Sequence, residues 1–272
     1  MHRVIRRLIL VAAFWVGGQD AIACSGLGNT SVEAIYPSAA EIPENTLRLY
    51  VYFSAPIGET DVLAHIHLKN AAGQPVEGAF LSNRFDLWSP DRRRLTLLFD
   101  PGRVKTGLRA HEALGRALQA GQSFELGIDR ALKDASGCPL AHSFSHTFHA
   151  GPEDFSTPDP ALWQLDKPAA ATDDPIEVHL AKPLDHVSLA YRLRITTATG
   201  DTVSGRIELG EGERTWRFYP NTPWIAQTYR LSVDPRLEDL AGNRPGERFD
   251  RLILDQPVDF VLHREFRIKN ND

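Results

Sequence analysis

The clearest pattern in the chain is an alternation of apolar and polar residues that occurs twice. Residues 121–138 read GQSFELGIDRALKDASGC, and residues 226–243 read AQTYRLSVDPRLEDLAGN. Alternation with a period of two predicts a half-buried β-strand in each copy. The predicted inward residues are Phe124, Leu126 and Ile128 in the first copy and Tyr229, Leu231 and Val233 in the second. A repeat of about a hundred residues predicts two similar domains in tandem.

Each of these strands leads into the same short motif, Leu-x-Asp-x-x-Gly. Asp134 and Gly137 occupy it in the first copy, and Asp239 and Gly242 in the second. An aspartate side chain can close a local turn, and glycine accepts a positive φ. We interpret the two aspartates as turn residues rather than as a catalytic pair, because a turn is needed in both copies and an active site only once.

Three further segments correspond between the copies and also predict strands: 47–53 with 176–180, 64–78 with 191–205, and 95–101 with 214–220. The middle pair, strand, glycine turn and strand, predicts a hairpin. In residues 47–53 the aliphatic residues and Phe53 form one face, and Arg48, Tyr50 and Tyr52 form the other. Short strands separated by Gly, Pro and Asp, with almost no helical period, predict an all-β fold of two tandem antiparallel β-sandwiches.

The predicted domains span residues 24–152 and 161–272. The first carries an insertion at 104–120, in which Leu114 and Leu118 have the spacing of a short surface helix. Residues 153–160, rich in proline and acidic residues, form the predicted linker. Asp154, Asp159, Asp166, Asp173 and Asp174 surround it; a solvated acidic linker is favoured over a calcium site, because they follow no spaced calcium-loop pattern.

Residues 1–23 have the features of a signal peptide: a basic start, an apolar run too short to span a membrane, and small residues before Cys24. We therefore expect an exported protein, periplasmic or extracellular, without a transmembrane segment. Removing the leader leaves 27 basic and 34 acidic side chains, a formal charge of −7. This acidic balance, with no basic stripe, argues against nucleic acid as a partner.

Cys24 and Cys138 are the two cysteines, and export predicts that they form a disulfide. The alternative is a lipoprotein acylated at Cys24. We disfavour a lipid anchor because Gly17, Gly18, Gln19 and Asp20 separate the apolar run from the cysteine. Acylation would also leave Cys138 as a lone thiol.

The two copies resemble the bacterial Ig-like domains of surface-layer proteins, adhesins and other exported proteins. The resemblance rests on IYPSAAEIPENTLRLYVYFSAPI and GQSFELGIDRALKDASG, with their echoes PIEVHLAKPL and AQTYRLSVDPRLEDLAGN, and covers nearly all of the mature chain. It implies a non-catalytic module that binds a protein or surface polymer, or that acts as a scaffold, without a cofactor. Cys138, where Gly-Asn is expected, and the insertion depart from that pattern.

The opening pattern also resembles the periplasmic copper-binding β-sandwich family, although the early histidine of that family is missing here. The alternative function is therefore a periplasmic copper- or zinc-binding accessory protein. Its candidate ligands are the pairs His65 with His67 and His142 with His146, in which each spacing places two imidazoles on one face of a strand. Solvent-facing histidines without a metal remain the simpler interpretation.

One further cluster is a candidate for partner binding. Trp88 precedes Arg92, Arg93 and Arg94, and an exposed aromatic beside arginines is typical of interface residues. The alternative is a tryptophan packed on the sandwich edge beside a solvated turn. The sequence contains no nucleophile elbow, phosphate-binding loop or Cys-x-x-Cys motif, so we do not expect an enzyme.

Overall fold

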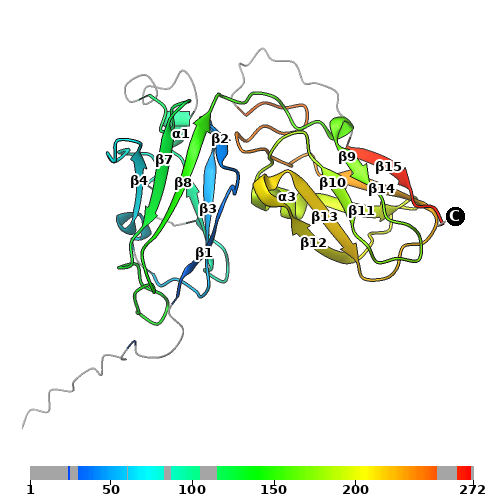
Figure 1. Ribbon diagram of the computed structural model, residues 1–272, viewed down its shortest axis with the longest axis horizontal. Helices are drawn as coiled ribbons and strands as arrows, with labels where there is room; N and C mark the ends of the chain where they lie inside the picture. The colour runs from blue at the N-terminus through cyan, green and yellow to red at the C-terminus, as the bar shows by residue number, and fades with distance from the viewer. Residues whose placement is uncertain are drawn as a thin grey trace, which may run out of the picture.

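A computed structural model describes Cys24 and residues 30–59, 61–82, 87–104, 115–249 and 262–270. The predicted leader, most of the insertion and the first part of the closing strand segment lie outside these residues. The described chain is mainly β, and its strands form two units (Figure 1). We call them the first sandwich and the second sandwich.

The first sandwich packs two sheets face to face, with strand orders β1-β3-β6-β5 and β2-β8-β7-β4. All pairings are antiparallel except β2 with β8. Its elements are β1 (Val32–Tyr36), β2 (Glu41–Pro43), β3 (Arg48–Phe53), the 3-10 helix η1 (Val62–His65), β4 (Ile66–Asn70), β5 (Leu87–Trp88), β6 (Arg94–Leu98), α1 (Pro101–Val104), β7 (Ser123–Ile128) and β8 (Phe144–Gly151). Alternate residues of both sheets fill one hydrophobic core.

The second sandwich packs the sheets β12-β13-β10-β9 and β11-β14-β15 around a second core. Its elements are η2 (Pro160–Leu162), β9 (Gln164–Asp166), β10 (Ile176–His179), α3 (His186–Arg192), β11 (Leu193–Thr197), β12 (Gly205–Leu209), η3 (Glu211–Glu213), β13 (Thr215–Pro220), β14 (Thr228–Val233) and β15 (His263–Arg267). Trp216 is fully buried, and Trp163 and Trp224 are nearly so. Trp224 is a core residue whose indole N–H donates to the carbonyl of Asp174 at 2.8 Å.

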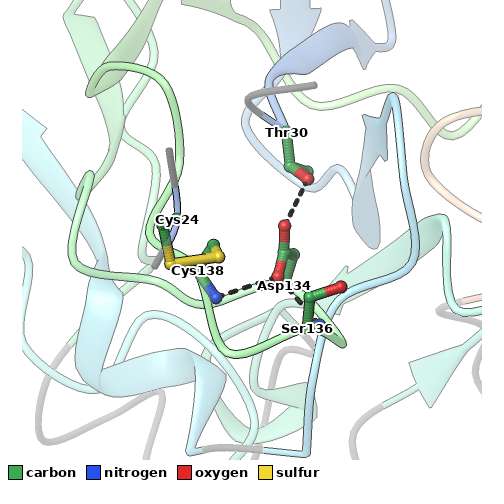
Figure 2. The surroundings of a disulfide bond; sticks show 5 residues. All are labelled: Cys24, Thr30, Asp134, Ser136 and Cys138. Atoms are coloured by element: carbon green, nitrogen blue, oxygen red, sulfur yellow. Dashed lines mark hydrogen bonds between the residues drawn. A yellow bond between two sulfur atoms is a disulfide. The ribbon is translucent and has the colours of Figure 1, made fainter. Parts of the chain in front are cut away.

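The predicted strand-and-turn repeat is present in both sandwiches. It forms β7 and β14, whose inward residues are buried as predicted. In the first turn Asp134 Oδ1 accepts the backbone N–H groups of Ser136 and Cys138 (Figure 2). In the second turn Asp239 Oδ1 accepts the backbone N–H of Asn243. Gly137 and Gly242 take φ values of +80° and +79°, so each turn needs the glycine that the motif supplies.

The two cysteines are joined next to the first of these turns. Cys24 and Cys138 form a disulfide with a Cα–Cα distance of 5.6 Å (Figure 2). Thr30 Oγ1 donates to Asp134 Oδ2 at 2.8 Å and ties the same N-terminal segment to the same turn. The start of the described chain is thus fixed to the turn by a covalent bond and a hydrogen bond.

Two features differ from the sequence prediction. The expected hairpins are short: each has one antiparallel bridge, Lys69 with Pro75 and Thr196 with Thr202, flanked by a few backbone hydrogen bonds. In the second sandwich β11 and β12 belong to different sheets. The helix α3 was not predicted either. It begins at an aspartate N-cap and buries a single residue, Leu189, which is too little for a recognisable helical period.

The ends of the insertion are fastened by two buried arginines. Arg103 donates to the carbonyls of Gly115 and Arg116, each at 3.1 Å, and Arg116 donates to the carbonyl of Val104. Leu118, placed by the sequence on a surface helix, is buried in the first core. Residues 105–114 lie outside the described part of the chain, so the predicted helix is untested.

Replacing both cysteines by serine should destabilise the first sandwich. The bond closes a loop spanning 114 residues of sequence, and losing such a cross-link should lower the free energy of unfolding by about 2–4 kcal/mol. Urea unfolding of the wild type and the double variant, each with and without reductant, measures the change. Reductant should shift the wild type to the variant's midpoint and leave the variant unchanged; equal midpoints for all four samples would contradict the prediction.

Candidate functional site: the joint between the sandwiches

The outer face of β3 is covered by the second sandwich. The sequence placed Arg48, Tyr50 and Tyr52 on a polar face opposite the core, yet Tyr50 is only 3% exposed. Helix α3 lies on the side of the second sandwich that faces β3 (Figure 1). The Tyr50 hydroxyl lies 2.8 and 3.0 Å from the two carboxylate oxygens of Asp185, to which it donates.

Asp185 has two structural roles at this contact. It is the N-cap of α3, where Oδ1 accepts the backbone N–H of Ser188 at 2.8 Å, and it also accepts from Tyr50 of the first sandwich. Its side chain is almost fully buried, and a buried carboxylate without partners would cost several kcal/mol. Contact with the first sandwich therefore satisfies a charge that the second sandwich buries.

An ion-pair chain continues from Asp185 along the joint. Arg48 lies with Nε 3.6 Å from Asp185 and donates through Nη2 to Glu238. Arg244 donates to the other carboxylate oxygen of Glu238, at 2.7 Å from Nη2 and 3.1 Å from Nε. One glutamate of the second sandwich is thus shared by an arginine from each sandwich.

Burial and neighbouring charges shift the pKa values of the side chains in this row of ion pairs. Burial raises the pKa of Asp185, while the Arg48 guanidinium opposes that rise. Burial lowers the pKa of Arg48, but Asp185, Tyr50 and Glu238 outweigh it and the net direction is upward. Burial and then Asp185 raise the pKa of Tyr50 well above its usual range. Tyr50 therefore remains a protonated donor at neutral pH.

A second contact centres on Glu213, which is fully buried. Its carboxylate accepts the backbone N–H of Ser38 at 2.9 Å and the Ser38 hydroxyl at 3.0 Å. His186 Nδ1 lies 3.3 Å from the same carboxylate, and the imidazole stacks on Tyr36 with a centroid distance of 3.5 Å. Glu213 has a φ of +51°, a strained value for a non-glycine residue that these contacts hold in place.

The segment joining the sandwiches is bound to both of them. Asp154, expected to be part of a solvated linker, pairs with Lys182 Nζ at 2.6 Å, and Lys182 pairs equally closely with Asp239. The Asp154 carbonyl accepts from the side-chain amides of Asn45 and Asn243. The expectation of a solvated linker is therefore corrected at Asp154, because a lysine and two asparagines satisfy its polar groups inside the joint.

Apolar contact completes the joint. Leu240 of the second sandwich belongs to the hydrophobic core of the first, and its carbonyl accepts the backbone N–H of Leu47 at 2.9 Å. A Cβ at Gly242 would overlap Leu47, so glycine is required here for close approach as well as for the turn. The repeated turn of the second sandwich is thus itself an interface element.

Beside these contacts the joint opens into a cleft of about 370 Å³, which we call the arginine-lined cleft. Two of its lining residues, Arg48 and Tyr50, come from the first sandwich. The second sandwich supplies the others: Asp185, Val187, Ser188, Tyr191, Arg192, Arg236, Glu238 and Arg244. The sequence placed Arg48 and Tyr50 on the polar face of β3 but did not single out the residues of the second sandwich. Two tyrosines on that polar face were a sign that it is covered.

The four candidate metal-binding histidines occupy different environments and do not point toward one common site. His67 on β4 points outward and pairs with Asp129 at 2.8 Å, whereas His146 on β8 shares the inward face with Phe148. Burial lowers the pKa of His146. His142 is exposed before β8, and His65 ends η1. Among the described residues, no group of three or more His, Cys, Asp or Glu side chains is arranged to hold a metal ion.

The predicted cluster of Trp88 with three arginines is divided between several environments. Arg92 folds back over the Trp88 ring at 4.9 Å and donates to the carbonyls of Ile57 and Gly58. Trp88 itself packs on the first core beside Phe53. Arg94 lies over the Tyr50 ring at 5.8 Å, and Arg93 is exposed. Trp88, Arg92 and Arg94 thus make contacts within the first sandwich, the alternative that the sequence had left open.

Comparisons with known proteins give no family for this chain. Neither the family models nor the curated proteins contain a match. Among solved structures, native alpha-2-macroglobulin from Escherichia coli, in a structure spanning domains MG0-NIE-MG1, is 13% identical, with a TM-score of 0.30, over 90% of this chain and 73% of that fragment. The surface-layer protein SbsC is 12% identical, with a TM-score of 0.30, over 75% of this chain and 24% of its own. Similarities this weak carry no information about function.

Changing Tyr50 to Phe should weaken the joint. It removes the hydroxyl that donates to Asp185, and a buried carboxylate that loses a donor costs about 1–3 kcal/mol in the free energy of unfolding. Tyr219→Phe is the matched control, because the Tyr219 ring stacks under Arg206 and its hydroxyl has no hydrogen-bond partner within the described residues. Urea unfolding measures both; equal effects of the two substitutions would contradict the assignment.

Asp234, beneath Arg192 and Arg236, should give the protein a pH-dependent stability. The hydrogen bond from Arg236, assisted by Arg192, holds the pKa of Asp234 well below its usual range. Ionised Asp234 therefore adds to the free energy of unfolding at pH values above its unfolded pKa of about 3.9. This stabilisation is lost as the pH falls through its lower pKa in the folded protein. Wild type should be more stable than Asp234→Asn at pH 7, and the difference should shrink below about pH 4. A difference that stays constant in that range would contradict the ion pair.

Proposed function

We propose that the chain is an exported, non-catalytic Ig-like protein that acts by binding or scaffolding, with domains at residues 24–152 and 161–272. The joint is the observation that carries this proposal. Asp185 and Glu213, both nearly or fully buried, accept hydrogen bonds from Tyr50 and Ser38 of the first sandwich, and Lys182 links the buried Asp239 to Asp154 of the connecting segment. A joint of this kind holds two binding surfaces at a fixed angle, which suits a scaffold.

The disulfide supports the proposed export. A disulfide persists in oxidising compartments, so the Cys24–Cys138 bond is consistent with a location outside the cytoplasm. In the part of the chain that the structure describes, no helix has the length and apolar character needed to cross a membrane. We propose that residues 1–23 direct export and are then removed.

A reporter fusion tests export. Residues 1–30 placed before a phosphatase that is active only outside the cytoplasm should give an active enzyme, because the basic start and apolar run supply a secretion signal. Deleting the apolar run LILVAAFWV is the control and should abolish activity. The mature chain should begin at Cys24 by mass spectrometry. A full-length chain retaining residues 1–23 in the cytoplasm would contradict the export proposal.

A second experiment tests the rigid joint. In wild type, NMR relaxation should report one rotational correlation time for both sandwiches. Glu213→Ala removes the carboxylate that binds Ser38 and His186, so the two sandwiches should tumble more independently and the free energy of unfolding should fall by about 1–3 kcal/mol. Glu208→Ala, which removes an exposed glutamate from β12, is the control and should change neither. Independent tumbling in the wild type would contradict the scaffold role.

A further inference from the structure

The arginine-lined cleft carries more positive than negative charge. Arg48, Arg192, Arg236 and Arg244 line it, against the carboxylates of Asp185 and Glu238. Asp234 lies beneath Arg192 and Arg236 and pairs with both. Counting all three carboxylates, one positive charge is left over, in a chain whose formal net charge is −5. This surplus positive charge is confined to the cleft and is accessible to solvent.

The arginines at the open side of the cleft also have donors to spare. Arg192 uses only Nη1 toward Asp234, and Arg236 uses Nε and Nη2. Within the described residues, Arg192 Nε and Nη2 and Arg236 Nη1 make no hydrogen bond. The two side chains are 32% and 65% exposed. Exposed guanidinium groups with unused N–H donors can bind a further planar anion by donating charge-assisted hydrogen bonds to it.

Part of the remaining cleft wall is apolar, so the cleft suits an organic ligand better than a bare inorganic ion. Tyr191, on the last turn of α3, is 69% exposed, the largest exposed fraction of any large hydrophobic side chain described. It lines the cleft together with Val187, one helical turn earlier. A volume of about 370 Å³ lies within the range of small-ligand sites, which combine apolar walls with a few charged groups.

We propose that the arginine-lined cleft binds a carboxylate, carried by a small organic acid or by the end of a longer molecule. The inference rests on the binding role proposed above and names the chemistry of one of its sites. A carboxylate carries a single negative charge, equal to the surplus in the cleft, whereas a phosphate monoester carries about −1.5 to −2 at neutral pH. Two carboxylates of the protein, Glu238 and Asp234, are already held here between pairs of arginines.

Benzoate, benzamide and phenyl phosphate are probes that separate charge from shape. They share a ring that Tyr191 and Val187 can contact and differ in the charged group. Titration of the full mature protein, followed by NMR shifts of the Ser188 and Tyr191 backbone amides, should show saturable binding of benzoate, with benzamide and phenyl phosphate at least several-fold weaker. Added salt should weaken benzoate binding, because the site is open to solvent.

Arg236→Gln is the test variant, and Arg206→Gln is its matched control. Both arginines are exposed and ion-paired, at 65% and 62% exposure, but Arg206 lies on β12 outside the cleft. Asp234 keeps Arg192 as a partner when Arg236 is changed, so the fold should be retained. Benzoate affinity should fall roughly tenfold in Arg236→Gln, the value of one charge-assisted hydrogen bond, and stay unchanged in Arg206→Gln.

A pair of short peptides ending in phenylalanine, one with a free C-terminal carboxylate and one amidated, separates the two sources of the carboxylate. If the free-acid peptide binds as tightly as benzoate, the carboxylate belongs to the end of a longer molecule. If only benzoate binds, the carboxylate belongs to a small organic acid. Equal binding of benzoate and benzamide, tighter binding of phenyl phosphate, or no binding of any probe would overturn the assignment. If the sandwiches still tumble together in that case, the scaffold proposal stands and only the cleft assignment is lost.

Discussion

The arrangement of the two sandwiches depends on carboxylates that the second sandwich buries at its boundary. Asp185, Glu213 and Asp239 are each nearly or fully inaccessible, and each would be severely destabilising without partners. Tyr50 and Ser38 of the first sandwich bind two of them, and Lys182 links the third to Asp154 of the connecting segment. Rotating one sandwich against the other would remove Tyr50 from Asp185 and Ser38 from Glu213 together, so these two contacts specify the relative orientation.

The same arrangement creates the arginine-lined cleft. Arg48 reaches from β3 to Glu238, which Arg244 approaches from the other side, and α3 places Tyr191 and Arg192 at the opening. Residues of both sandwiches therefore line the cleft. Binding and the geometry of the joint are therefore linked through shared residues, because Asp185 caps α3 and also accepts from Tyr50.

The repeated turn shows how one local element acquires two tertiary uses. In the first sandwich Asp134 closes the turn, accepts from Thr30 and stands beside the disulfide. In the second, Asp239 closes the same turn but also pairs with Lys182, and the neighbouring Gly242 lets Leu47 approach. Where the first copy has a cysteine that anchors the N-terminal segment, the second has Asn243, which binds the connecting segment.

The sequence by itself determined the strands, the inward residues of β7 and β14, and both turns, because alternation and the Asp-Gly motif are local physical signals. It misjudged Tyr50 and Asp154, whose contacts depend on residues far away along the chain. Helix α3 and the cleft were out of reach for the same reason. Only the tertiary structure decided which polar face is covered, because the local sequence around a polar side chain does not show which distant residue will form a hydrogen bond or ion pair with it.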